Sequence, residues 1–81
     1  MIVHVLYFGI VRERLGVREE DVVLADESTV ADLMAQLSAA HEQIAEGVAS
    51  IRVAVNQEYV DSTVALSDND EVAIIPPVSG G

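Results

Sequence analysis

The residues with the most distinctive chemistry stand at the end of the chain, in the run Pro76-Pro77-Val78-Ser79-Gly80-Gly81. Proline fixes φ and lacks a backbone N–H, so the proline pair stops a strand and favours an extended path. Glycine has no Cβ, so Gly80 and Gly81 can enter a passage too narrow for other residues. The only reactive group that such an end presents is the α-carboxylate of Gly81. The pattern predicts a tail that is threaded into a partner, and a frayed, inert terminus is the alternative.

The rest of the chain offers few side chains for catalysis. It has no cysteine, and its four basic residues are all arginines, which excludes thiolate and Schiff-base chemistry. The two histidines, His4 and His41, lie far apart in the sequence. We therefore expect no independent catalytic set, no metal site and no bound cofactor.

Charge and length narrow the possible partners and location. A net charge of -10 argues against nucleic acid and against anionic membrane surfaces, because few cations are available to meet phosphates. The apolar run 2–11 is too short to span a membrane and lacks the features of a signal peptide. We expect one domain in a cytoplasmic protein of 81 residues, with no nucleic-acid or membrane partner.

The elements that must position the tail begin with a strand over residues 2–8, whose nearly continuous apolar character predicts burial on both faces. A short helix over 10–15 should end at Gly16. A second strand within 17–24 should pair antiparallel with the first, and 19–21 should form a solvated turn or edge. Three apolar side chains of the short helix are expected to face inward: Ile10, Val11 and Leu15.

The main helix should begin after Thr29, a suitable N-cap with Asp32 three residues later. Apolar spacing predicts that this helix continues to about Gly47. Two further strands should flank the turn at 56–57, and the last strand should cover 71–75 after a turn at 67–70. The residues of the buried helical stripe are Val30, Leu33, Met34, Leu37, His41 and Ile44.

The two most apolar strands are the first and the last, which predicts that they lie side by side in the sheet. A right-handed crossover makes them parallel. The pattern therefore predicts an α+β fold of the ubiquitin-like β-grasp type over residues 1–75, with one main helix across one face of a mixed sheet. Residues 76–81 form an extended C-terminal tail in this scheme.

Three segments carry a resemblance that runs nearly from end to end. They are Leu6-Tyr7-Phe8-Gly9-Ile10-Val11-Arg12-Glu13, Val53-Ala54-Val55-Asn56-Gln57 and Asp70-Glu71-Val72-Ala73-Ile74-Ile75-Pro76-Pro77-Val78-Ser79-Gly80-Gly81. With these segments the chain resembles the small subunit of molybdopterin synthase, a ubiquitin-like sulfur carrier. The last segment is specific, whereas Gly-Gly alone would also fit other ubiquitin-like carriers. Ile74 and Ile75 depart mildly from the family pattern, where aromatic residues are frequent.

The resemblance implies a mechanism for the terminal carboxylate. A separate enzyme that uses ATP and magnesium adenylates Gly81, and sulfur from a persulfide donor then replaces AMP to leave a thiocarboxylate. The tail enters the large subunit of the synthase and donates sulfur to cyclic pyranopterin monophosphate, which builds the dithiolene that binds molybdenum. The family assembly is a heterotetramer of two small and two large subunits.

The resemblance also implies which residues meet the partner. Phe8, Tyr59 and Ile75 should form an apolar docking face with Arg12 at its edge, although Phe8 and Ile75 could equally belong to the core. Gly80 gives the tail access to the partner's active site. The tail residues expected to contact the partner are Pro76, Pro77, Val78 and Ser79.

Three alternatives use the same features. Gly81 could be joined to a lysine of a target, which would make the chain a ubiquitin-like protein modifier. The chain could carry sulfur for another pathway, such as thiamine or cysteine synthesis. It could also be a non-covalent β-grasp binding module with an inert tail.

Overall fold

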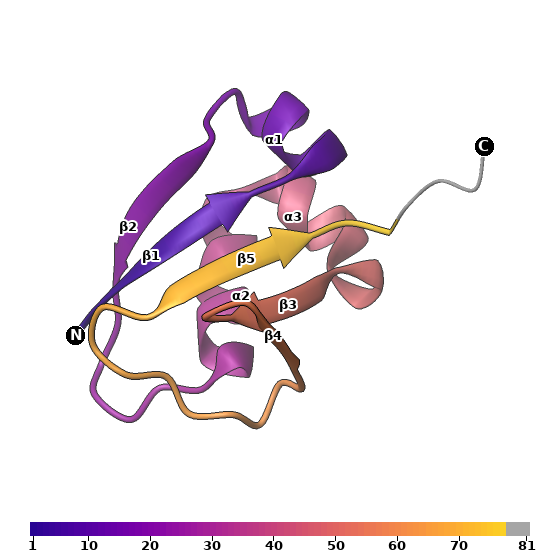
Figure 1. Ribbon diagram of the computed structural model, residues 1–81. Coiled ribbons are helices and arrows are strands. Elements are labelled where there is room, and N and C mark those ends of the chain that lie inside the picture. Colours follow the sequence, from indigo (N-terminus) through magenta and orange to yellow (C-terminus); the bar gives the residue numbers. More distant parts are fainter. Residues whose placement is uncertain (78–81) are drawn as a thin grey trace.

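The computed structural model describes residues 1–77, which form a five-stranded sheet with helices packed on one face (Figure 1). Val78, Ser79, Gly80 and Gly81, four of the residues assigned above to the tail, lie outside the described residues. The elements in chain order are β1 (Ile2–Tyr7), α1 (Gly9–Leu15), β2 (Glu19–Val23), α2 (Val30–Ala40), α3 (Glu42–Gly47), the 3-10 helix η1 (Val48–Ser50), β3 (Arg52–Val55), β4 (Glu58–Val60) and β5 (Glu71–Ile75).

The strands follow the spatial order β2-β1-β5-β3-β4. β1 and β5 pair in parallel, with Val5 opposite Val72, and β2 pairs antiparallel with β1. These pairings confirm the mixed sheet and the adjacent first and last strands predicted from the sequence. Because β1 and β5 run in the same direction, α1 and the segment that follows β5 begin at the same end of the sheet (Figure 1).

Only one face of the sheet is covered by helices. Val3, Val5 and Tyr7 of β1 are buried against them, while Ile2 on the opposite face is exposed. The prediction that β1 is buried on both faces was therefore wrong, because within residues 1–77 the helices pack on one side only. The remaining core residues are Val11, Val22, Leu24, Val30, Leu33, Met34, Leu37, Ile44, Val53, Leu66, Val72 and Ile74.

The main helix begins as predicted but ends earlier. Thr29 and Asp32 form a reciprocal capping box at the start of α2. The helix does not run on to Gly47, because His41 adopts an extended conformation with φ -132° and ψ 105° and separates α2 from α3. Ile44 is still buried, so the apolar stripe is divided between two helices that both pack on the sheet.

The short helix α1 ends at Gly16 as predicted, and Gly16 has a left-handed conformation with a φ of +74°. Val11 is buried and Leu15 partly buried, as expected, but Ile10 is 47% exposed and the prediction for that residue was wrong. Phe8 is not part of β1 and instead precedes α1 in an extended conformation. The β1–α1 junction thus directs both Phe8 and Ile10 to the surface.

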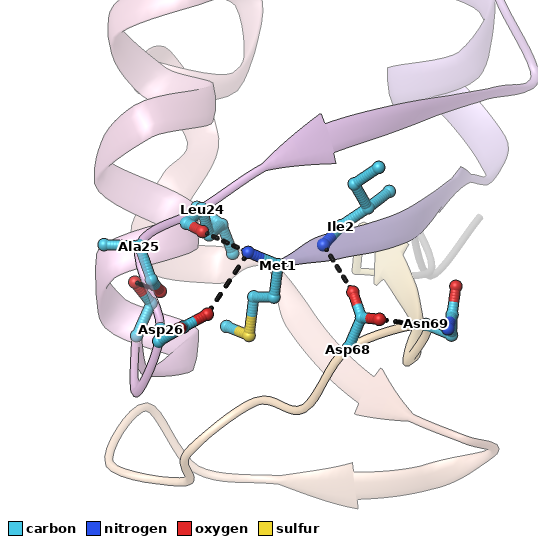
Figure 2. A network of polar contacts seen from close by, with 8 residues as sticks. Met1, Ile2, Leu24, Ala25, Asp26, Asp68 and Asn69 are labelled. Atoms are coloured by element: carbon cyan, nitrogen blue, oxygen red, sulfur yellow. Dashed lines mark hydrogen bonds and ion pairs between the residues drawn. The ribbon is translucent and has the colours of Figure 1, made fainter.

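Polar contacts close the end of the sheet away from the tail (Figure 2). The Met1 ammonium group donates to the Leu24 carbonyl at 2.8 Å and lies 3.4 Å from Asp26 Oδ1. The Ile2 N–H donates to Asp68 Oδ1 at 2.8 Å, which ties β1 to the predicted turn at 67–70. No helix within residues 1–77 is long and apolar enough to cross a bilayer.

Candidate functional site

The root of the tail is held at the junction between β1 and α1. The Phe8 N–H donates to the Ile74 carbonyl at 3.3 Å, which fixes this junction beside the end of β5. Gly9 has a φ of +55°, and a Cβ built on it would lie only 2.9 Å from Pro76 Cγ. Glycine is therefore required here both for its backbone conformation and for the close approach of Pro76. In the sequence, Gly9 lies between the predicted strand over 2–8 and the predicted helix over 10–15, and no local pattern indicates its proximity to Pro76.

The uncovered face of the sheet carries a shallow, mostly apolar hollow of about 310 Å³. Phe8 and Tyr59 rise on its margins with 44% and 59% of their surface exposed. Ala54 and Ala73 are cross-strand partners, and their small side chains leave room between the larger ones. The lining residues are Phe8, Ala54, Gln57, Tyr59, Glu71, Ala73 and Ile75. The sheet thus brings together the three apolar residues that were expected to form a docking face.

The exposure of these side chains separates surface from core. Phe8 is an exposed large apolar residue, and Ile75 is half-buried beside the hollow. Contiguous exposed apolar surface of this kind marks interaction sites more often than isolated apolar residues do. The apolar face defined by Phe8, Tyr59 and Ile75 is therefore a candidate docking face.

One cation that borders this face is Arg52. Its guanidinium carbon lies 4.3 Å from the centroid of the Tyr59 ring. Arg52 does not itself line the hollow and borders it through Tyr59. Arg12, which was expected at the edge, is exposed on α1 and likewise does not line the hollow. Strand alternation places Arg52 on the same face as Ala54, and this signal could have identified it from the sequence.

A second hollow of about 420 Å³ lies beside the tail root. It is bounded by α1, α3 and the prolines that follow β5. Exposed Ile10 is one of the residues that line this hollow. The lining residues are Ile10, Val11, Arg14, Gln43, Glu46, Gly47, Ser50, Ile51, Pro76 and Pro77. The first residues of the tail therefore leave the domain along a groove with mixed apolar and polar walls.

Both histidines lie in polar clusters away from the candidate docking face. The Tyr7 hydroxyl donates to Glu20 at 2.7 Å, and His41 Nε2 lies 3.1 Å from the same carboxylate. Burial, together with this hydrogen bond, raises the pKa of Tyr7. Because Tyr7 is almost fully buried, this cluster joins β1, β2 and the α2–α3 junction rather than facing a substrate.

His4 belongs to the second cluster. Its Nδ1 lies 2.6 Å from Asp21 Oδ1, and its Nε2 lies 3.4 Å from Asn69 Oδ1. The hydrogen bond to Asp21, followed by that to Asn69, raises the pKa of His4. Within residues 1–77 no three histidine or carboxylate side chains are arranged to hold a metal ion.

The chain is similar to known proteins along nearly its whole length. Residues 5–81 match the ThiS family. The molybdopterin synthase sulfur carrier subunit of Chlamydomonas reinhardtii is 47% identical over 83 residues, which cover all of both chains. The human protein of the same name is 39% identical over 98% of this chain and 93% of its own length.

Solved structures share the fold over nearly the whole chain. Subunit 1 of a molybdopterin converting factor from Pyrococcus furiosus superposes with a TM-score of 0.86 at 34% identity, covering 96% of this chain and 99% of its own. The small archaeal modifier protein 1 of Haloferax volcanii superposes with a TM-score of 0.82 at 25% identity. The superposition covers 95% of this chain and 98% of the Haloferax chain. A complex of subunits 1 and 2 of the molybdopterin-converting factor from Helicobacter pylori gives 0.73 at 27% identity, with both chains fully covered.

These full-length similarities confirm the ubiquitin-like α+β fold and the family that the three resembling segments indicated. The chain belongs to the ThiS family and, within it, to the molybdopterin synthase sulfur carrier subunits.

Proposed function

We propose that this protein carries sulfur on its C-terminus and donates it within a molybdopterin synthase. The Gly81 carboxylate is a poor electrophile, because its negative charge repels attack and oxide is a poor leaving group. A separate enzyme first joins it to AMP, using ATP with magnesium and releasing pyrophosphate. A persulfide then attacks the acyl carbon and displaces AMP, and a thiol cleaves the resulting acyl disulfide to leave the Gly81 thiocarboxylate.

The thiocarboxylate sulfur then passes to cyclic pyranopterin monophosphate, and water restores the Gly81 carboxylate. Two such transfers supply the two sulfurs of the dithiolene. In this mechanism Gly81 is a co-substrate, and Gly80 lets the tail pass through a narrow channel. The protein itself needs no bound cofactor, since ATP and magnesium are used by the activating partner.

The observation that carries this proposal is the position of the tail root. Pro76 and Pro77 follow a strand at the centre of the sheet and leave the domain next to an exposed apolar face. A partner that covers this face would receive the tail directly, because the prolines stiffen the first residues beyond β5. The names of the full-length relatives support the same function.

The partner on this face is the large subunit of molybdopterin synthase, in a heterotetramer of two small and two large subunits. Phe8, Tyr59 and Ile75 supply the apolar contact, and Arg12 contributes at its periphery. The complex of subunits 1 and 2 of the molybdopterin-converting factor from Helicobacter pylori supports a second subunit as the partner. Val78 and Ser79 follow the prolines into the partner. We place this exchange in the cytoplasm, without a nucleic-acid or membrane partner.

Intact-mass spectrometry tests the carrier chemistry. The full chain is incubated with the adenylating enzyme of the same genome, ATP, magnesium and a sulfide source. The mass should rise by the difference between one sulfur and one oxygen atom, and fragmentation should localise the change to Gly81. An unchanged mass, with the same enzyme active on another carrier, would reject the proposal.

The variant Gly81→Ala tests whether the tail must be narrow at its end. It keeps a terminal carboxylate but adds a methyl group. This variant should fold normally, because the site lies beyond the core, yet lose most sulfur transfer. Sulfur transfer by Gly81→Ala at the rate of the wild type would show that the partner's channel does not require glycine at this position.

The docking face is tested with Tyr59→Asp. A charge at this exposed position should weaken binding to the purified large subunit by at least about tenfold, while the free energy of unfolding changes by less than about 0.5 kcal/mol. Val23→Asp is the control, because Val23 is exposed on β2 outside the hollow. Equal binding losses for the two variants, in calorimetric titration, would place the interface elsewhere.

A protein modifier is the second candidate, favoured by the similarity to the small archaeal modifier protein 1. The same activated Gly81 would then form an amide with a lysine of a target. Tryptic peptides carrying a C-terminal remnant of this chain on lysine, found in cell extract, would establish conjugation. A carrier for thiamine or cysteine synthesis would acquire the same thiocarboxylate but would fail to make molybdopterin with the purified large subunit.

A further inference from the structure

Arg52 and Tyr59 form a stacked pair at the border of the candidate docking face. Arg52 is the first residue of β3 and lies opposite Ile75 of β5. Tyr59 lines the hollow of about 310 Å³ on the uncovered face, and both residues line a larger hollow of about 570 Å³ between α2 and the β3–β4 hairpin. The pair is therefore a ridge between two concave surfaces.

The charge of Arg52 is not neutralised within the described part of the chain. The ion pairs among residues 1–77 involve Met1, His4 and His41, and none includes an arginine. Asp61 lines the same larger hollow, but its carboxylate accepts hydrogen bonds from the N–H and the hydroxyl of Thr63. An arginine without an ion-pair partner among residues 1–77 is unexpected in a chain with 14 acidic and four basic residues. Arg52 is therefore available to a partner.

The stacking also prepares the geometry of Arg52. A guanidinium group over an aromatic ring is attracted to the face of the ring, and its N–H donors that point away from the ring remain free to bind a partner. Those donors match the two oxygens of a carboxylate. Because Tyr59 already restricts the side chain, less conformational entropy is lost when the carboxylate binds.

We propose that Arg52, held on the ring of Tyr59, binds a carboxylate side chain of the protein that docks on the Phe8–Tyr59–Ile75 face. This inference rests on the proposed function, which identifies that protein as the large subunit. The acidic side chains of this protein repel carboxylates, so Arg52, which lies opposite Ile75 at the border of the docking face, gives a directional contact. Arg52 thereby sets the orientation of the docked partner and helps to select it.

The test compares the affinities of Arg52 variants for the purified large subunit by calorimetric titration. Arg52→Gln should weaken binding about tenfold at low salt, and Arg52→Glu should weaken it further. Both differences should shrink at about 1 M salt, where exposed charges are screened. Arg18→Gln is the matched control, since Arg18 is exposed outside both hollows and should bind like the wild type.

Two further measurements separate a partner contact from a structural role. Arg52→Lys keeps the charge but loses the planar fork, so it should bind several-fold more weakly than the wild type. Replacement of the matching partner carboxylate by arginine should restore binding of Arg52→Glu. Failure of every acidic residue on the partner's contact surface to give this rescue would overturn the inference.

The outcomes distinguish this inference from the function on which it rests. If the wild type binds the large subunit and Arg52→Gln binds equally well at low salt, the proposed function stands and the role of Arg52 is rejected. If the wild type does not bind the large subunit, both are rejected. Thermal unfolding of Arg52→Gln should match the wild type, because Arg52 is exposed.

Discussion

Gly9 and Gly16 bound the same short helix and both have positive φ values, +55° and +74°. Their surroundings differ. A Cβ at Gly16 would meet nothing within 4 Å, whereas one at Gly9 would meet Pro76 Cγ at 2.9 Å. The two positions therefore separate the cost of a left-handed backbone from the cost of crowding the tail root.

Substitution of each glycine by alanine tests this difference. Gly16→Ala should reduce the free energy of unfolding by about 1 kcal/mol, because a side chain disfavours the left-handed region. Gly9→Ala should lose about 1 kcal/mol more, since its Cβ pushes on the Pro76 ring. Urea denaturation measures both losses. Equal losses would show that Pro76 moves aside at no cost.

The Gly9 variant should also affect function, because displaced prolines redirect the tail. Its rate of thiocarboxylate formation should fall more than that of Gly16→Ala.

At the scale of single elements, the two ends of α2 have different causes. A capping box stabilises its N-terminus, whereas contacts with other elements surround its C-terminus. The Thr29 hydroxyl accepts from the Asp32 N–H at 3.3 Å, and Asp32 accepts from the Thr29 N–H at 2.8 Å. The far end meets β1 and β2 instead, where the Tyr7 and His41 rings contact edge to face at a centroid distance of 6.2 Å. Local chemistry therefore sets the start of α2, and tertiary contacts set its end.

Removal of the capping hydroxyl should weaken α2 measurably. Thr29→Ala should cost about 1 kcal/mol of stability, because the Asp32 N–H loses its partner at the first turn. Thr29→Ser retains the hydroxyl and should stay within about 0.5 kcal/mol of the wild type. Denaturant unfolding followed by circular dichroism gives both values. A similar loss in both variants would assign the effect to the Thr29 methyl group instead.

At the scale of the whole molecule, the two ends of the sheet differ in character. Arg12, Arg14 and Arg52 lie toward the end where β1 and β5 finish, together with the tail root. The opposite end is held by polar contacts of the N-terminal residues with acidic loops (Figure 2). His4 adds to this closure by joining β1 to Asp21 of β2 and to Asn69 of the turn before β5.

The His4 contacts predict a pH dependence of stability. Because folding raises the pKa of His4 above its ordinary value of 6.5, their contribution is complete below that value. It is lost as pH rises through the raised folded-state pKa. The wild type should therefore exceed His4→Gln in stability by more at about pH 5.5 than at about pH 8.5. Urea titrations across this range measure the difference, and a constant difference would contradict the assignment.

The sequence by itself determined the local features of this protein. Strand positions, the cap at Thr29 and the turn at 67–70 depend on residues a few positions apart, so periodicity and turn chemistry were sufficient. The adjacent parallel β1 and β5 followed from their apolar character and the handedness of crossovers. Three contiguous segments of sequence also carried the resemblance to the family, which the match over residues 5–81 confirms.

Only the tertiary structure decided which apolar residues face solvent and which groups meet at the tail root. Phenylalanine and isoleucine are residue types that usually lie in the core, but the β1–α1 junction directs Phe8 and Ile10 to the surface. The contact between Gly9 and Pro76 joins opposite ends of the chain. The stacking of Arg52 on Tyr59 depends on the register of β3 and β4. Such features arise from strand pairing and from covering one face of the sheet, which no local pattern encodes.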